Sequence, residues 1–273
     1  MSQTTWLSIS LFNNKSKRPV ILRKGISLFL HKLHLSGDLI CFRIFFNSSG
    51  GENIRVAILS ATKSASRIAC FTDNYFKSFY KEKGYIVSAS KFPVNSLFLD
   101  FPNNSIQYGL FTLRRKEYSP SEVNFHNKFN SFVIAALGNP SWNKNKEALF
   151  FFAFCLNQCL LNHLISSVIL DKQMLVHLIY EVKASPQDIE TFRKMLQKDD
   201  DMLKVPSIDV NTDEFEKLVN AELNEIAIES IDSYIVKIKK IKTYINECIG
   251  LLPQQQQQLN YYINQTFKIR IEV

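Results

Sequence analysis

The chain has 273 residues, and 46% of them are hydrophobic, which argues against an intrinsically disordered protein and allows one large domain or two small ones. Five cysteines without regular spacing argue against a disulfide framework and predict a reducing, cytoplasmic location, and residues 1–12 lack the pattern of an export signal. The net charge of +8 is uneven, because residues 1–180 hold 21 Lys and Arg against 9 Asp and Glu, whereas residues 181–273 hold 12 against 16. This asymmetry indicates either an anionic partner for the first part (an acidic peptide, a nucleic acid or an acidic subunit) or a role in solubility alone.

The amino-terminal half carries strand patterns on either side of one helix. Residues Thr4–Phe12 alternate with a period of about two and include aromatic and β-branched side chains, which predicts a strand. A helix is predicted from Pro19, a favourable first-turn residue, and ends near Ser36 and Gly37. Asp38–Phe46 and Asn53–Ser60 are predicted to form a hairpin, because the residues between them are turn-forming Asn, Ser and Gly. Ile106–Arg114 is predicted to be a further strand.

The segment Arg67–Lys91 interleaves basic and aromatic residues, which allows two interpretations. The first is an amphipathic helix whose aromatic face is turned inward. The second is a surface that pairs with and stacks on nucleic acid. No helix-turn-helix, RRM or zinc-finger pattern accompanies the segment, so the sequence favours the amphipathic helix.

Helical periodicity dominates the carboxy-terminal half. Ala148–Leu170 carries no formal charge and is long enough to cross a bilayer. Polar residues near its middle, such as Asn157 and Asn162, favour a buried helix of a soluble protein over a membrane span. Asp213–Ile249 carries apolar residues at steps of three and four, with acidic residues early and lysines late, and is predicted to be one long amphipathic helix.

Cys155, Cys159 and His163 follow one another at four-residue steps and would lie along one stripe of a helix. Thiols and imidazoles are zinc ligands. However, the first and third residues would be about 12 Å apart along the helix axis, too far to converge on one tetrahedral ion. The sequence therefore favours a buried core stripe, and it predicts neither a metal nor a cofactor.

The hairpin holds two arginines, Arg43 and Arg55, in otherwise apolar strands. A buried guanidinium without a partner is costly, so such residues either form a structural salt bridge or bind the carboxylate or phosphate of a ligand. A turn centred near Ser49 would place the two arginines directly opposite each other on one face of the hairpin. Both residues are therefore candidate binding residues for an anion.

Several short segments occur in a fixed order along the chain, and each matches a motif of one known family. They are Trp6, Phe42-Arg43-Ile44, Asn53-Ile54-Arg55-Val56, Tyr118–Asn127, Phe129–Leu137 and Asn260–Gln265. This order resembles the carboxy-terminal domain of lanthipeptide dehydratases, a family also known as thiopeptide-type bacteriocin biosynthesis proteins. The resemblance covers essentially the whole chain.

The resemblance implies a lyase that removes glutamate from glutamylated Ser or Thr of a ribosomally made precursor peptide and leaves a dehydroamino acid. Related stand-alone members of the family join two dehydroalanines into a pyridine ring. Such chemistry needs a base for the α-proton and cations for the leaving carboxylate. By the resemblance, Arg43 and Arg55 would be the cations, and Tyr118 and Tyr261 would be further catalytic participants.

Two positions depart from the motifs of the family. Asn124 stands where the family has Arg, and Asn260 stands where it has His. Both remain candidate substrate-binding residues. The departures motivate a second hypothesis, in which the protein is a non-catalytic, peptide-binding subunit of a split dehydratase. The expected partners are the precursor peptide, a separate glutamylating subunit and, for a homodimer, a second copy of the chain, whereas a membrane is not expected.

Taken together, the patterns predict an α+β fold. The amino-terminal half should hold a mixed, largely antiparallel sheet with helices packed on it, and the carboxy-terminal half should be helical. We expect residues 1–273 to form a single stand-alone domain that resembles the small, elimination domain of the dehydratases. A nucleic-acid-binding protein is the third hypothesis, and it depends on Arg67–Lys91.

Overall fold

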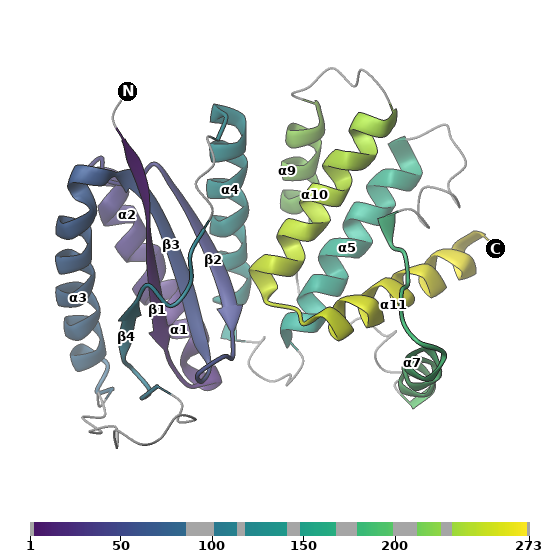
Figure 1. The fold of residues 1–273 in the computed structure, drawn as a ribbon, viewed down its shortest axis with the longest axis horizontal. Coiled ribbons are helices and arrows are strands. Elements are labelled where there is room, and N and C mark those ends of the chain that lie inside the picture. The colour runs from purple at the N-terminus through teal and green to yellow at the C-terminus, as the bar shows by residue number, and fades with distance from the viewer. Residues whose placement is uncertain are drawn as a thin grey trace. The chain divides into compact units, whose positions relative to one another are not determined.

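The computed structural model has an α+β fold, as predicted, and its chain divides into two compact units, Met1–Asn145 and Lys146–Val273 (Figure 1). Each unit is described by itself. The expectation that residues 1–273 act as one stand-alone domain stays a prediction. The structure describes residues 3–85, 101–113, 118–140, 148–167, 179–198, 212–224 and 231–271.

The first unit is built on a four-stranded antiparallel sheet in the order β2-β3-β1-β4. β1 has the predicted bounds and β2 and β3 form the predicted hairpin, whereas the fourth predicted strand is too long. Only three residues of that strand pair with β1, because Gly109 follows with a φ of 70° and turns the chain away from the strand direction. Arg114, its predicted end, lies outside the described residues. The strands are β1 (Thr4–Phe12), β2 (Cys41–Asn47), β3 (Asn53–Ala61) and β4 (Ile106–Tyr108).

Helices cover one face of this sheet (Figure 1). The predicted first helix is confirmed, with Pro19 in its first turn and an end at Ser36, and it is interrupted by a π-helical turn. The strand residues that face the helices are fully buried, among them Ile9, Ile44 and Ile58. The helical elements are η1 (Lys15–Lys17), α1 (Arg18–Val20), η2 (Ile21–Ile26), α2 (Ser27–Leu35), η3 (Thr62–Ser64), α3 (Ala65–Glu82) and α4 (Pro120–Leu137).

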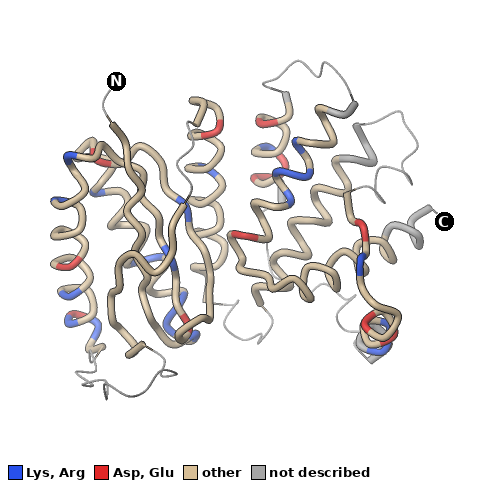
Figure 2. Tube along the Cα trace, in the orientation of Figure 1, with Lys and Arg blue, Asp and Glu red and all other residues tan. Residues whose placement is uncertain are grey.

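Helix α3 contains most of the segment Arg67–Lys91, for which the sequence allowed either an amphipathic helix or a nucleic-acid-binding surface. Its packing is that of an amphipathic helix. Phe76, Phe79 and Tyr80 are buried, whereas Lys77 and Lys81 are exposed. In Figure 2 the basic positions are distributed along the outer side of this helix. These three buried rings are not available to stack on bases, whereas Phe71, Tyr75 and Tyr85 are partly exposed, so the packing weakens the nucleic-acid interpretation without removing it.

Two asparagines of α4 complete the backbone hydrogen bonds of the edge strand β2. The Asn130 side chain accepts a bond from the Ile44 N–H (2.9 Å) and donates to the Phe42 carbonyl (3.2 Å). Asn127 in the same way accepts from the Phe42 N–H (3.0 Å) and donates to the Ile40 carbonyl (3.1 Å). A carboxamide carries one acceptor and one donor group, as a peptide unit does, so these side chains replace a neighbouring strand.

The second unit is helical, and the predicted helix after Glu147 is confirmed as α5. Its middle is buried, with Asn157 bonded to the Ala153 carbonyl (2.8 Å). In the described part of the chain, no helix is both long and apolar enough to cross a membrane. The helices are α5 (Ala148–Ser167), α7 (Pro186–Lys198), α9 (Thr212–Asn224), α10 (Ile231–Ile249) and α11 (Pro253–Ile271).

The prediction of one long helix over Asp213–Ile249 is wrong. The Lys237 ammonium donates to the Glu222 carbonyl over 3.3 Å, yet in one straight helix these residues would be about 22 Å apart along the axis. The chain therefore reverses between α9 and α10, and both helices pack on α5. The three- and four-residue spacing of apolar residues is present in both α9 and α10, because each helix packs an apolar face against α5. The spacing alone therefore did not reveal that there are two helices.

The stripe of Cys155 and Cys159 lies in the core of this unit, as expected. Burial raises the pKa of Cys155 to about 12 and that of Cys159 to about 11. Burial also lowers the pKa of His163, against an opposing effect of Glu216. Among the residues described, no group of three or more potential ligands is arranged to hold a metal.

Lys242 of α10 is largely buried, and we expect it to make the free energy of unfolding change with pH in the alkaline range. Its ammonium lies 4.6 Å from the Tyr180 ring centre and donates to the Ile179 carbonyl (2.7 Å). Burial, with a smaller effect of Lys239, lowers its pKa from 10.5 to about 8. Between pH 8 and 10.5 the unfolded chain therefore binds more protons than the folded chain, and the contribution of Lys242 to stability rises with pH.

The measurement is the free energy of unfolding of the wild type minus that of Lys242→Met, from pH 7.5 to pH 10.5. This difference should rise by roughly 2–3 kcal/mol across the range. Lys217→Met, which removes an exposed lysine of α9, should show a flat difference over the same range. A flat difference for Lys242→Met would contradict the assignment.

Candidate functional site

The two arginines of the hairpin lie on the same face of the sheet, but they are not directly opposite each other. Arg43 pairs with Ala57, and Arg55 pairs with Phe45. The turn is centred at Gly50 rather than near Ser49, and Gly50 and Gly51 both have positive φ values (71° and 105°). The predicted opposition is therefore wrong, because Arg43 pairs with a residue two positions beyond Arg55 on β3. The shared face is correct, because a shift of two residues keeps the same parity.

The arginine face is the surface of the sheet that carries Arg43 and Arg55, opposite the face packed against α1 and α2. The segment after β4 crosses in front of it (Figure 1). Phe111 of this segment lies over Arg55, with 5.3 Å between the guanidinium carbon and the ring centre, and Phe45 lies 4.9 Å from the guanidinium carbon of Arg43. The two rings meet edge to face at 5.8 Å. Aromatic walls therefore hold both guanidinium groups in place.

Among the described residues, this face has buried polar side-chain atoms without a hydrogen-bond partner, and they include Trp6 Nε1, Ser10 Oγ and Arg55 Nε. Trp6 and Ser10 alternate on β1 with the core residues, and Ser10 is directly opposite Arg55 in the register. Directly opposed residues of an antiparallel pair have Cβ atoms about 5 Å apart. Because buried polar atoms are nearly always paired, unpaired donors gathered on one face indicate a place for an acceptor from a ligand.

The charge of Arg55 is not balanced by an acid. No described carboxylate lies within ion-pair distance of it, and burial lowers its pKa. Arg18 differs, because it donates to Glu52 at 3.0 Å, which offsets part of the effect of burial on its pKa. A structural salt bridge therefore does not explain why an arginine stands at position 55 of this apolar strand. The side chain is only partly buried, so a solvent-borne anion can reach it.

Tyr118 lies at the other end of the arginine face. Its ring meets that of Trp6 at 6.0 Å and that of His126 at 5.3 Å, both edge to face. His126 is buried in α4, which begins with a capping box between Ser119 and Glu122. An imidazole and a phenol can each donate and accept a hydrogen bond, so this group can orient a polar substrate.

The remaining predicted site residues are placed elsewhere. Asn124 lies on the exposed side of α4. Asn260 and Tyr261 belong to α11 in the second unit, where Asn260 donates to the Glu181 carbonyl (2.7 Å) and Tyr261 is buried, with its ring 6.0 Å from that of Phe192. The structure thus brings Arg43, Arg55 and Tyr118 to one face of the first unit, and it gives Asn260 and Tyr261 packing contacts within the second.

Sequence reasoning did not assign Ser10, Phe111 or His126 to the site. Ser8 and Ser10 carry a usable signal, because two serines at alternate positions of an apolar strand mark a polar face. No sequence signal marks Phe111, since its position depends on the turn at Gly109. His126 lies inside a matched motif but had no assigned role.

Comparisons with known proteins agree with this fold. No protein-family model and no curated protein matches the sequence. Among solved structures, the chain is similar to TbtD, a pyridine synthase from thiomuracin biosynthesis, with a TM-score of 0.59 and 12% identity over 96% of this chain and 97% of that one. It is also similar to MibB, a tRNA-dependent lantibiotic dehydratase from Microbispora sp. 107891, with a TM-score of 0.51 and 10% identity over 98% of this chain and 29% of that one. At these identities the likeness shows the fold alone, and that fold is shared with proteins of thiopeptide and lanthipeptide biosynthesis.

Proposed function

We propose that the protein is a lyase of ribosomal peptide natural product biosynthesis, which eliminates glutamate from glutamylated Ser or Thr of a precursor peptide. The observation that carries the proposal is Arg55, a partly buried cation without a carboxylate partner among the described residues, directly opposite the unpaired donor of Ser10. The likeness of almost the whole chain to a stand-alone biosynthetic enzyme supports the class of substrate.

In the proposed reaction, a base removes the α-proton of the modified residue. The electron pair of the Cα–H bond forms the Cα=Cβ double bond, the Cβ–O bond breaks, and glutamate leaves as a carboxylate. Arg55 and Arg43 stabilise the charge that develops on the leaving oxygen, as preorganised donors do in acyl-transfer sites.

The test is incubation of the full chain with a synthetic, glutamylated Ser peptide, followed by mass spectrometry. Release of free glutamate with formation of dehydroalanine supports the proposal. No release from this peptide, while the protein binds it, refutes the elimination and leaves the second candidate. A parallel incubation with a peptide that holds two dehydroalanines tests the pyridine-forming reaction of TbtD, and turnover of only that peptide would replace the proposed substrate.

The second candidate is a non-catalytic peptide-binding subunit that works with a separate glutamylating protein. Two observations favour it, because Asn124 is exposed on α4 and Asn260 is already bonded to the Glu181 carbonyl. Neither position supplies the charge that the family motif has there. Co-elution with a glutamylating subunit, without glutamate release by the isolated chain, is the expected result for this candidate.

A further inference from the structure

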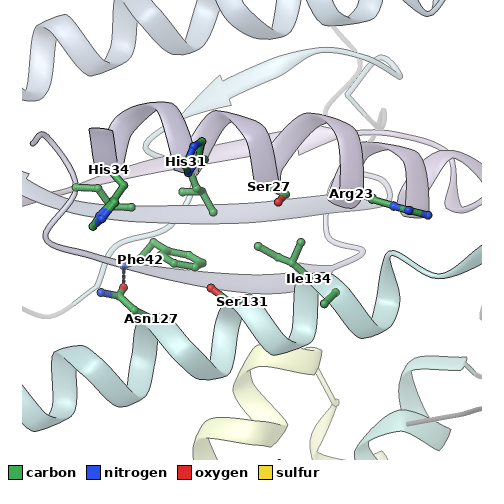
Figure 3. Close-up of a pocket in the computed structure, with 11 residues that line it drawn as sticks. Arg23, Ser27, His31, His34, Phe42, Asn127, Ser131 and Ile134 are labelled. Carbon is green, nitrogen blue, oxygen red and sulfur yellow. Dashed lines mark hydrogen bonds between the residues drawn. The ribbon is translucent and has the colours of Figure 1, made fainter. Parts of the chain in front are cut away.

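A groove of about 580 Å³ lies on the other side of β2, between α2 and α4 (Figure 3). It is separate from the arginine face, because Phe42 in its floor and Arg43 are consecutive in a strand and point to opposite faces. The groove therefore has no part in the reaction proposed for Arg43 and Arg55.

One wall of the groove, the basic wall, carries one arginine and two histidines. Arg23, Ser27, His31 and His34 follow one another at steps of three and four, so they form one stripe along η2 and α2 (Figure 3). All four are exposed. His34 lies eleven helical steps after Arg23, which corresponds to about 16 Å.

The floor and the opposite wall carry no charge. Leu30, Phe42 and Ile134 form an apolar floor, and Asn127 and Ser131 of α4 form a polar wall (Figure 3). The carboxamide of Asn127 is already used by the backbone of β2. None of the described lining residues is acidic, so nothing within the groove neutralises the basic wall.

Large apolar side chains also lie exposed beside the groove. On α2, Leu28 is 52% exposed and Leu35 is 73% exposed, and both are helical neighbours of His31. Ile40, which is 39% exposed, precedes β2. Exposed apolar residues next to a basic groove are typical of a surface that binds an amphipathic, acidic partner.

We propose that this groove binds an acidic stretch of the peptide substrate, at a place distinct from the residue that is modified. The stretch is about five to six residues long when extended, since about 16 Å corresponds to five steps of 3.3 Å between six residues. A carboxylate at one end pairs with Arg23, a carboxylate at the other end accepts a hydrogen bond from His31 or His34, and apolar side chains between them contact Leu30 and Phe42. The inference rests on the proposed function only for the identity of the peptide.

Fluorescence anisotropy of a labelled peptide tests it on the full chain. The probe is an acetylated Glu-Leu-Leu-Phe-Glu amide, and the comparison peptides carry Gln or Lys in place of both Glu residues. We expect the acidic probe to bind at least about tenfold more tightly than either comparison peptide, and its affinity to fall as salt rises from 50 to 300 mM. Equal binding of the three peptides would overturn the proposal.

Two groove variants and one control locate the binding. Ser131→Trp fills the groove from an exposed position, and the triple change Arg23→Ser, His31→Asn and His34→Asn removes its basic wall. Each should weaken binding of the acidic probe about tenfold or more. The control Lys77→Ser with Lys81→Asn removes charge from the exposed side of α3 and should leave binding unchanged. If Ser131→Trp binds the probe normally, the groove is not the site.

Two further outcomes separate the alternatives. A labelled single-stranded DNA that binds wild type more tightly than the acidic peptide, and competes with it, would assign the groove to nucleic acid and refute the inference. The elimination assay uses a glutamylated peptide without other acidic residues, so its result tests the proposed reaction alone. Failure of the probe to bind therefore refutes the groove, and failure to release glutamate refutes the reaction.

Discussion

Replacing Arg55 with methionine is expected to lower the rate of glutamate release about 100-fold or more, while the melting temperature stays the same or rises. The loss follows from removing a preorganised donor for the leaving carboxylate. The melting temperature should not fall, because the charge of Arg55 is partly buried and no described acid compensates it. Burial accordingly lowers the pKa of Arg55. The double change of Arg43 and Arg55 to methionine should abolish binding of the glutamylated peptide with the fold intact.

Arg18→Met is the matched control, since it removes an arginine that has a carboxylate partner. The Arg18 side chain is 11% exposed and bonds to Glu52 at 3.0 Å. Its loss should destabilise the first unit by about 2 kcal/mol, which is a fall of roughly 5 °C in melting temperature, and should leave glutamate release per folded molecule unchanged. Unfolding of Arg55→Met, or normal turnover by it, would show that Arg55 is structural.

Replacing Asn130 with leucine is expected to produce the largest loss of stability, about 2–4 kcal/mol. Asn130 is fully buried, and its removal leaves the Ile44 N–H and the Phe42 carbonyl without their partner. The leucine side chain fills a similar volume but has no polar atoms. Urea denaturation followed by circular dichroism measures the change.

Asn127→Leu provides the comparison, because Asn127 makes similar bonds to the same strand from a partly exposed position. Water can replace its carboxamide, so the expected loss is about 1 kcal/mol. If the two variants lose the same free energy of unfolding, burial of the carboxamide does not determine the size of the loss. Hydrogen bonding to β2 would then matter less than the packing of α4.

Local patterns of the sequence predicted the strands and the first helix well. Thr4–Phe12 alternates because one face of β1 meets the core, and Pro19 begins a helix because its missing N–H is not needed there. The length of β4 and the reversal between α9 and α10 were missed. Both depend on where the chain turns and what it then packs against, and neither changes the local periodicity.

The candidate site was predicted only in part, for a related reason. The burial cost of a guanidinium pointed to Arg43 and Arg55, because both stand in otherwise apolar predicted strands. Their register could not be predicted to the residue, because Gly50 and Gly51 allow a turn centred one residue further along. Phe111 reaches Arg55 only through a connection whose path no local pattern encodes.

The carboxamides of Asn127 and Asn130 also determine how this protein can meet other chains. An open edge strand invites a peptide to add itself to the sheet, and it is a common starting point for aggregation. Here the stretch of β2 around Phe42 and Ile44 already has its backbone bonds filled by α4. A substrate therefore cannot be recognised there by strand addition, and it must be held through its side chains instead.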